Sequence, residues 1–556
     1  MNSEPTKGQD GLDRFNSKVF KKEYFEEMGF EDYLSRVYAQ PSIAYSAHQR
    51  LYFSIMYWGV EKHIRANREF SHYKFFEDPI DNGKDAVFGL DKSLMSLVGI
   101  FHAAAARDGQ ERRFLLLRGP VGSSKSTILR LLKKGLIDYT KKEEGKLYSF
   151  KWVAETEDDR RIISLAPGEK DACCPLHEEP LRLLPEDVCQ KVVQELNELK
   201  IKTKDGERER LDTEQIDVEG DLCPFCRFIY SEYLKKYNGN WREVLTKHIR
   251  VYRLIFSEAD RIGIGSFRPK DEKNQDATEL SGDINYRKIA ELGRESDPRA
   301  FDFSGEFQVA NRGILGLEEA LKLQNAFLYD FLGATQEHVV KPKRFAESYI
   351  DEVIIAATNT PEYEKLRKDE YMEALKDRMS EVEIPYVLNF EKETEIYEKT
   401  YRRKKGGVHI GPHTIKMASL WAVLTRIKAT SEKTSLKISA IDKAKLYAGR
   451  RLKGYNEEAI HDLIAEHNDE GLIGISPRYI QDMIGHAKTY AASHALPCVN
   501  WFLVKKFLEE KLANHWSLKT EQINDFTSKL SDAHAEFQSI IKAEVQEAIA
   551  FDESDI

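Results

Sequence analysis

Short runs of consecutive apolar residues alternate with helical patterns along the middle of the chain. These runs begin at Phe114, Val251, Gly313 and Val353. Short apolar runs set between helices are typical of strands that are buried on both faces of a parallel sheet. The pattern therefore predicts an α/β fold for the central part of the chain.

The chain is predicted to be helical on both sides of this core. Residues 1–84 place aromatic and aliphatic side chains at helical spacing, as at Tyr33 and Val37, and helical patterns continue from Tyr386 to the end. The simplest interpretation of these stripes is packing against a neighbouring domain. Between about residues 140 and 300, an insertion rich in proline, cysteine and charge interrupts the strand pattern.

The composition narrows the class of protein. Of the 556 residues, 41% are apolar and 32% are charged, and the net charge is −9. This is typical of a soluble globular protein and does not favour nucleic-acid binding. No apolar run reaches the ~18–20 residues of a membrane span, and the first residues lack the apolar stretch of a secretory signal. Six cysteines are too few for a disulfide scaffold in so long a chain, so we expect a cytoplasmic protein. From the charge and the apolar runs we expect that it binds neither nucleic acid nor a membrane.

The strongest signal for chemistry follows the apolar run at Phe114. It is the segment Gly119-Pro120-Val121-Gly122-Ser123-Ser124-Lys125-Ser126-Thr127. The segment matches a phosphate loop, G-x-x-x-x-G-K-[ST], placed between a strand and a helix. The backbone N–H groups of such a loop hold phosphate oxygens, Lys125 would reach the β- and γ-phosphates, and the Ser126 hydroxyl would coordinate Mg²⁺.

One position departs from the usual loop. Ser124 stands where a glycine normally precedes the lysine. A side chain there is expected to alter the loop geometry or to weaken the affinity for nucleotide. The sequence predicts a site for ATP and Mg²⁺, and a chance match or a degenerate loop is the alternative.

Hydrolysis also needs an acidic residue at the end of a strand. Two segments are candidates: Glu318 and Glu319 after the run at Gly313, and the segment 257–260 after the run at Val251. We favour the first pair, because adjacent acids directly after an apolar run match the hhhhDE arrangement with Glu in place of Asp. A charged residue where a strand reaches the surface is the alternative for either.

Three further residues are predicted to contribute to a nucleotide site. Asn359 ends a buried strand, where its amide would bond a γ-phosphate or the attacking water. Arg378 precedes another strand, a position from which an arginine can act on the nucleotide of a neighbouring subunit. Arg478 lies in the first turn of a helix that Ser476 would cap. Each alone is a weak signal, because most surface arginines form ion pairs.

The order of these motifs resembles that of the AAA+ ATPases over roughly residues 85–490. The resemblance implies that Lys125 and Ser126 belong to the first nucleotide motif and Glu318 and Glu319 to the second, with Asn359 as first sensor, Arg378 as arginine finger and Arg478 as second sensor. It also implies a homo-oligomer, with a hexamer as one arrangement. The chain then divides into a helical N-terminal region (1–84), an AAA+ α/β core with the large insertion (85–395), a helical lid (396–490) and a helical C-terminal tail (491–556).

A closer resemblance rests on five strings. These are residues 119–122, 269–276, 310–314, 334–337 and 384–386. Together they look like the bacterial PrkA family, described as serine protein kinases on an AAA+ core. The resemblance implies an ATP- and Mg²⁺-dependent serine kinase with a protein substrate, in which Glu319 orients or deprotonates the acceptor.

Two alternatives to a kinase stay open. The chain ends at Ile556, where we expect much of the C-terminal kinase-like region of the family to be missing, and it contains neither an H-R-D-x-x-x-x-N catalytic loop nor D-F-G. A ring ATPase that remodels or degrades protein clients is one alternative, and the predicted finger and sensors favour it. A nucleotide-binding scaffold with little hydrolysis is the other.

Four residues in the insertion have the spacing of metal ligands. Cys174 and His177 form a C-x₂-H pair, and Cys223 and Cys226 form a C-x₂-C pair, with 45 residues between the two pairs. Such pairs can point two side chains at one Zn²⁺, and Cys₃His is a known structural set. The sequence predicts a structural zinc site, with free cysteines as the alternative.

Overall fold

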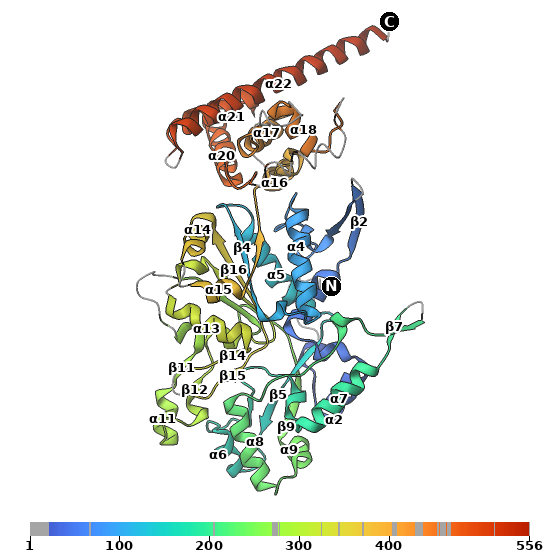
Figure 1. Ribbon diagram of the computed structural model, residues 1–556, viewed down its shortest axis with the longest axis vertical. Coiled ribbons are helices and arrows are strands. Elements are labelled where there is room, and N and C mark those ends of the chain that lie inside the picture. Colours follow the sequence, from blue (N-terminus) through green and yellow to red (C-terminus); the bar gives the residue numbers. More distant parts are fainter. Residues whose placement is uncertain are drawn as a thin grey trace, which may run out of the picture.

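The computed structural model describes most of the chain. It covers residues 22–65, 68–203, 206–269, 276, 278–323, 325–342, 345–369, 372–402, 408–428, 438–452, 455, 463, 467, 469–515 and 518–554. Figure 1 shows an α/β body with the insertion below it, a helical domain above it, and a long C-terminal helix across the top. The family-specific string 269–276 falls almost entirely outside the described residues.

A five-stranded parallel sheet forms the centre of the body (Figure 1). Its strand order is β10-β13-β16-β4-β17, and every neighbouring pair is parallel. The strands are β4 (Phe114–Gly119), β10 (Ile264–Phe267), β13 (Ile314–Glu318), β16 (Val353–Asn359) and β17 (Met379–Glu383). The predicted α/β class with a parallel sheet is confirmed, and the runs at Phe114, Gly313 and Val353 are three of its strands.

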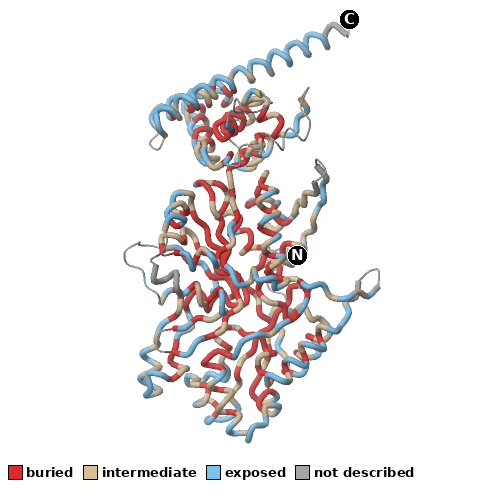
Figure 2. The backbone as a smooth tube through the Cα atoms, in the orientation of Figure 1, coloured by how far each residue is buried: buried red, intermediate tan, exposed pale blue. Residues whose placement is uncertain are grey.

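Helices cover both faces of this sheet, because alternate residues of each strand point to opposite sides. Leu115 and Leu117 of β4 pack on the side that holds the helix after the phosphate loop, whereas Leu116 packs on the other side. The first side is covered by α3 (Ala47–Met56), α4 (Asp91–Ala105) and α5 (Lys125–Thr140), and the second by α12 (Glu306–Ala310), α13 (Asn325–Gln336), α14 (Thr360–Lys368) and α15 (Glu373–Asp377). Figure 2 shows the buried residues concentrated along the sheet.

The run at Val251 forms a strand of a different sheet. It is β9 (Ile249–Leu254) in a four-stranded sheet of order β1-β9-β5-β6, where all pairs are antiparallel. Ile249 and Val251 lie in the hydrophobic cluster of the insertion, whereas Leu254 and the partly buried Tyr252 pack against the cluster on the α5 side of the parallel sheet. The expectation that it belongs to the parallel sheet was wrong. Its partners are β1 (Glu27–Met28), β5 (Leu147–Val153) and β6 (Asp171–Cys173).

The insertion and the N-terminal residues contain further short elements. The helices are α2 (Phe30–Ala39), α6 (Glu157–Ile163), α7 (Glu186–Glu198), α8 (Pro224–Lys236), α9 (Trp241–His248), α10 (Thr278–Ser281) and α11 (Tyr286–Leu292). The hairpins and short pairs are β2 (Val60–Arg65) with β3 (Arg68–Tyr73), β7 (Ile201–Thr203) with β8 (Gly206–Arg208), β11 (Asp283–Ile284) with β12 (Phe301–Asp302), and β14 (Val339–Val340) with β15 (Ser348–Tyr349). The region up to residue 84, which we predicted to be helical, therefore also contains a β-hairpin.

The part of the chain after residue 390 is helical and has its own core. The helix α17 (Thr414–Arg426) is buried almost throughout and packs against the helices around it. Those elements are α16 (Phe390–Arg402), α18 (Ala440–Tyr447), α20 (Pro477–Ser493), α21 (Trp501–Leu512), α22 (Thr520–Ser554) and the pair β18 (His409–Ile410) with β19 (Cys498–Val499). The far half of α22 projects from this core and is exposed (Figure 2). Among the described residues, no helix has the length and apolar character that crossing a membrane requires.

Candidate nucleotide-binding site

The predicted phosphate loop joins the central strand β4 to the helix α5. The strand ends at Gly119 and the helix begins at Lys125. A Cβ atom at Gly119 would lie 2.1 Å from the carbonyl oxygen of Ile384, so no side chain fits there. The loop therefore has the strand–loop–helix setting that the motif requires.

Ser124 adopts the backbone conformation that a glycine normally provides. Its φ is 69°, in the left-handed region, and Gly122 has φ 85°. A residue with a Cβ atom pays roughly 1–2 kcal/mol for this conformation, so the loop keeps its shape at some cost in strain. Serine at this position therefore keeps the left-handed backbone of the usual glycine but raises the conformational energy of the loop.

Lys125 lies folded into its own loop. Its Nζ donates hydrogen bonds to the carbonyl oxygens of Gly119 (2.8 Å) and Pro120 (2.7 Å), and Ser123 Oγ lies 3.4 Å away. Burial and the positive charge of Arg478 lower the pKa of Lys125 from 10.5 to about 8. An anion between the loop amides would offer this ammonium group a stronger partner than two neutral carbonyls.

We expect ATP binding to weaken as the pH rises above about 8. In the ATP-free protein Lys125 then loses its proton, and ATP binding has to restore it, which weakens the affinity by up to about tenfold per pH unit. Titrations of ATP between pH 7 and 9.5 measure this dependence. Arg478→Gln should move the decline to higher pH, because it removes a charge that lowers the pKa of Lys125. An affinity that is constant over this range would contradict the assignment.

Arg478 reaches the loop from the helical domain. Ser476 caps α20, as predicted, and its Oγ accepts a hydrogen bond from the N–H of Tyr479 (3.3 Å). A Cβ atom at Gly122 would lie 3.5 Å from the Cβ of Ser476 and 3.8 Å from the Cγ of Arg478. The structure thus brings the predicted second-sensor arginine to the phosphate loop, although more than 350 residues separate the two in sequence.

Asn359 lies beside the start of the loop. It is the last residue of β16 and pairs in register with Gly119 of β4. Its N–H donates to the Glu362 carboxylate (3.2 Å) in the first turn of α14. The negative charge of Glu362 partly opposes the lowering of the Lys125 pKa, so this carboxylate lies near the ammonium group. The predicted first-sensor residue therefore lies at the edge of the sheet that carries the loop.

The two acidic candidates have different places in the structure. Glu318 ends β13 and pairs with Ala357 of β16, so Glu318 and Glu319 lie at the same edge of the sheet as the loop. In contrast, Glu258 follows the antiparallel strand β9 and accepts a hydrogen bond from Ser266 Oγ (2.8 Å) in the middle of β10. The first pair is therefore the one positioned at the end of a parallel strand.

Glu319 is held by two basic side chains. Its carboxylate lies 3.1 Å from Arg268 Nη2 and 3.0 Å from Lys322 Nζ. The bond to Lys322, helped by the charge of Arg268, holds the pKa of Glu319 below its usual value, so it is ionised. Sequence analysis did not identify Arg268, which lies directly before the string that begins at Pro269.

We expect Arg268→Ala to raise the basal rate of ATP hydrolysis. An exposed ion pair of this kind contributes about 0.2–1 kcal/mol, so its loss leaves Glu319 held by Lys322 alone among the described residues and raises the rate by about 1.4- to 5-fold. Phosphate release under saturating ATP measures the change, and Arg287→Ala, an exposed arginine on α11, is the control. An unchanged or lower rate in R268A would show that this pair does not restrain Glu319.

Arg378 lies at the opposite end of the sheet. It precedes β17, whose first residue Met379 pairs with Phe114 at the start of β4, five residues before Gly119. At about 3.3 Å per residue this is roughly 17 Å from the loop. Its Nε donates to Gln336 Oε1 (2.7 Å) and its Nη1 to the carbonyl of Ala374 (2.9 Å). Arg378 therefore does not join the other predicted residues within one chain.

Two further residues connect the loop to the helical domain. Tyr386 donates its hydroxyl proton to the carbonyl of Val121 (2.7 Å), and its N–H bonds to Gly471 (2.8 Å). Arg426, with its side chain fully buried, stacks over the Tyr386 ring and pairs with Glu393 (2.7 Å). Sequence analysis missed this role of Arg426, and the available signal was an arginine shortly after the apolar run 420–424 of α17.

The predicted metal ligands are only partly brought together. Cys174, Cys223 and Cys226 converge, but the fourth residue with them is Glu178 and not His177. The His177 ring instead bonds to the Tyr252 hydroxyl through Nδ1 (3.0 Å). Within the described residues, the prediction was therefore wrong for His177.

The chain matches sequence models of one protein family over most of its length. Residues 28–435 match the PrkA AAA domain, and residues 441–556 match the PrkA serine protein kinase C-terminal domain. The chain therefore includes a region similar to the C-terminal domain that we expected to be largely missing.

Two named proteins and one solved structure are similar to this chain over different shares of its length. ATP-dependent protease PrkA of Bacillus subtilis strain 168 is 35% identical over 94% of this chain and 73% of its own length. Serine/threonine kinase YeaG of Escherichia coli strain K12 is 26% identical over 74% of this chain, which spans just over half (56%) of YeaG. A structure of the BchI–BchD complex of magnesium chelatase covers 80% of this chain and 97% of its own at 12% identity, but its TM-score of 0.28 is too low to support an argument.

Proposed function

This chain belongs to the PrkA family and carries its AAA domain, and from that premise we propose that it binds ATP with Mg²⁺ in the loop 119–127 and hydrolyses it to act on a protein substrate. The observation that carries the proposal is the position of Arg478. An arginine from the helical domain lies on the phosphate loop and lowers the pKa of the loop lysine. Nucleotide bound there would contact both domains at once.

The loop residues are suited to hold the phosphates. Lys125 Nζ would turn from the carbonyl oxygens of Gly119 and Pro120 to the β- and γ-phosphates, and the N-terminal end of α5 adds its positive dipole. The donor set also fits Mg²⁺, because the Ser126 hydroxyl and the Glu318 carboxylate are oxygen ligands at the same edge of the sheet. The ion would neutralise charge on the β- and γ-phosphates.

Glu319 would orient the attacking water. It is ionised and lies next to Glu318 at the strand end, so its carboxylate can accept a proton once Arg268 and Lys322 release it. Asn359 would bond the γ-phosphate or the same water from the neighbouring strand. Arg478 would contact the phosphates from the helical domain, so that nucleotide binding is coupled to the position of that domain.

The position of Arg378 favours a homo-oligomer. Because it lies roughly 17 Å along the strand from its own loop, we propose that it acts on the nucleotide of a neighbouring copy in a homo-oligomer. None of the six cysteines, all of them among the described residues, forms a disulfide, which agrees with the reducing cytoplasm where we place the protein.

Mixing two inactive variants tests this proposal. We expect Lys125→Ala and Arg378→Ala each to hydrolyse ATP slowly, and a mixture exchanged at low concentration and then concentrated to regain about a quarter of the wild-type rate. A quarter follows because an active interface needs an intact loop in one chain and an intact Arg378 in the next. A mixture no more active than the sum of its parts would contradict catalysis between chains.

Serine phosphorylation is the second candidate. It is favoured by the match of residues 441–556 to the PrkA serine protein kinase C-terminal domain and by the name of YeaG. In that case a serine hydroxyl of a protein substrate would take the place of water beside Glu319. The name of the Bacillus subtilis relative favours, instead, hydrolysis that drives remodelling or degradation of a protein client.

A further inference from the structure

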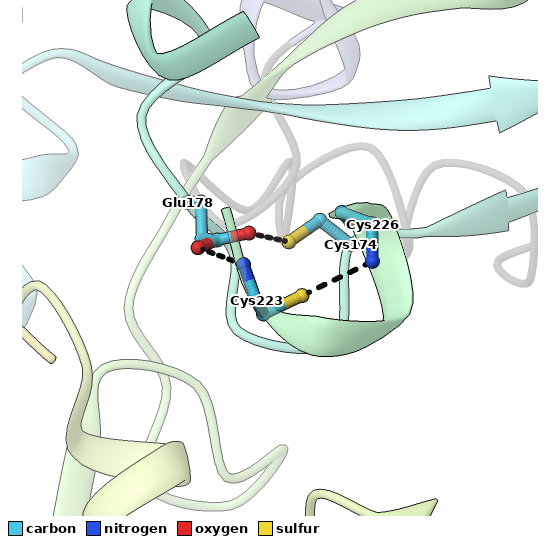
Figure 3. Close-up of side chains that lie close together, drawn as sticks. All are labelled: Cys174, Glu178, Cys223 and Cys226. Atoms are coloured by element: carbon cyan, nitrogen blue, oxygen red, sulfur yellow. Dashed lines mark hydrogen bonds between the residues drawn. The ribbon is translucent and has the colours of Figure 1, made fainter. Parts of the chain in front are cut away.

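We propose that Cys174, Glu178, Cys223 and Cys226 bind one structural Zn²⁺ ion in the insertion. This site is separate from the nucleotide site and does not depend on the proposed function. Two of its residues lie on the turn after β6, and the other two flank the first turn of α8. Figure 3 shows these two segments side by side, with the Cys174 sulfur directed toward the Glu178 carboxylate and the Cys223 sulfur toward the Cys226 backbone.

The geometry suits a tetrahedral ion. One ligand atom from each of the four side chains lies within 4.8 Å of every other, and all four residues are fully buried. Zinc bonds to sulfur and oxygen of about 2.0–2.3 Å place the ligand atoms of a tetrahedron roughly 3.5–3.8 Å apart. The cluster therefore needs only a small contraction to reach the geometry of a zinc centre.

Hydrogen bonds around the cluster suit negatively charged sulfur. The N–H of Cys226 donates to Cys223 Sγ (3.4 Å), and Trp152 Nε1 donates to Cys226 Sγ (3.3 Å). A neutral thiol is a weak acceptor, whereas a metal-bound thiolate is a good one. The donors are therefore positioned as in the outer shell of a metal site.

Glu178 is also prepared to act as a ligand. One carboxylate oxygen accepts the N–H of Cys223 (2.8 Å) and lies 3.5 Å from Arg182 Nη1. The other oxygen lies 3.1 Å from Cys174 Sγ, on the side of the three sulfur atoms. Outer-shell bonds of this kind fix the orientation of a carboxylate ligand.

A redox role for these cysteines fits the structure less well. The C-x₂-C pair at the start of α8 has the spacing of a redox motif. However, reactive cysteines lie in partly exposed positions, and all three thiols here are fully buried. A disulfide would also leave the third cysteine without a partner in the cluster.

The proposed ion would fix a turn that supports the nucleotide site. The carbonyl of Leu176 accepts a hydrogen bond from Asn311 Nδ2 (2.6 Å), and Glu179 pairs with Arg312. Only Gly313 separates Asn311 and Arg312 from β13, which ends at Glu318 and is followed by Glu319. Loss of the ion is therefore expected to loosen the insertion first and to affect ATP hydrolysis indirectly.

Metal analysis of the full chain, purified without chelator, tests the proposal. We expect about one zinc per chain in the wild type and less than about a tenth of that in Cys223→Ser. Glu178→Gln should release zinc to a chelator faster, whereas His177→Gln should retain it like the wild type. Zinc loss in H177Q together with retention in E178Q would overturn the ligand set, and a disulfide or the absence of bound metal in the wild type would overturn the site.

A second measurement covers the case in which the cysteine variants fail to fold. Co²⁺ exchanged into the wild type should give the visible absorption of a tetrahedral thiolate complex, and titrating a thiol-modifying mercurial should release the metal in step with modification of the buried cysteines. Octahedral Co²⁺ absorption would overturn the proposal. Because both readouts are independent of ATP, failure of this site is distinguishable from failure of the proposed ATPase.

Discussion

Replacing Lys125 with alanine is expected to lower the rate of ATP hydrolysis by at least about a hundredfold, because one preorganised charge on the reacting phosphates contributes a factor of about 10²–10³. The alanine removes the only charged side chain of the loop 119–127. ATP binding should weaken as well, since the loop amides remain but the ammonium partner is lost. Initial rates of phosphate release, together with equilibrium binding of ATP, measure both effects.

Lys141→Ala is the matched control for this variant. Lys141 is an exposed lysine at the other end of the same helix, α5. Its replacement should leave both rate and affinity within about twofold of the wild type, as surface substitutions usually do. If K125A kept wild-type affinity and rate, the loop would not be the nucleotide site.

Glu319→Gln is expected to separate binding from hydrolysis. The amide keeps the size of the side chain but cannot accept a proton, so hydrolysis should fall by about 10²–10⁴-fold, the contribution of a general base. ATP affinity should stay within about twofold of the wild type, because Arg268 and Lys322, which hold Glu319 among the described residues, lie outside the loop. Single-turnover hydrolysis and ATP titration on the same preparation test the two parts.

Two other glutamates, one adjacent to Glu319 and one distant from it, provide the comparison for E319Q. Glu318→Gln should raise the Mg²⁺ concentration needed for activity, while Glu337→Gln, an exposed residue after α13, should behave like the wild type. A rate above half that of the wild type in E319Q would exclude Glu319 as the residue that activates water.

The fold could be predicted where an apolar run is long and unbroken. The strands at Phe114, Gly313 and Val353 are buried on both faces, so their composition alone distinguishes them. The edge strand β10 escaped detection, because it has only four residues. The other edge strand, β17, is the strand expected after Arg378. The run at Val251 was assigned to the wrong sheet, since an apolar run does not reveal which strands pair with it.

The residues of the site could likewise be predicted only where their chemistry is local in sequence. The loop was predictable because its chemistry lies within nine consecutive residues. The approach of Arg478 to Gly122 depends on how the helical domain packs, which the sequence does not specify locally. The spacing of the cysteines indicated a metal site, but only the folded turn shows that Glu178 and not its neighbour His177 faces the sulfur atoms.

The fate of the γ-phosphate of labelled ATP tests the central claim most directly. With purified wild-type protein, Mg²⁺ and a generic protein substrate, we predict that the label appears as free phosphate at a rate per chain that rises with protein concentration, and that K125A releases almost none. Label transferred to serine with little free phosphate would assign the site to protein phosphorylation instead. No binding and no hydrolysis of ATP by the wild type would contradict the account.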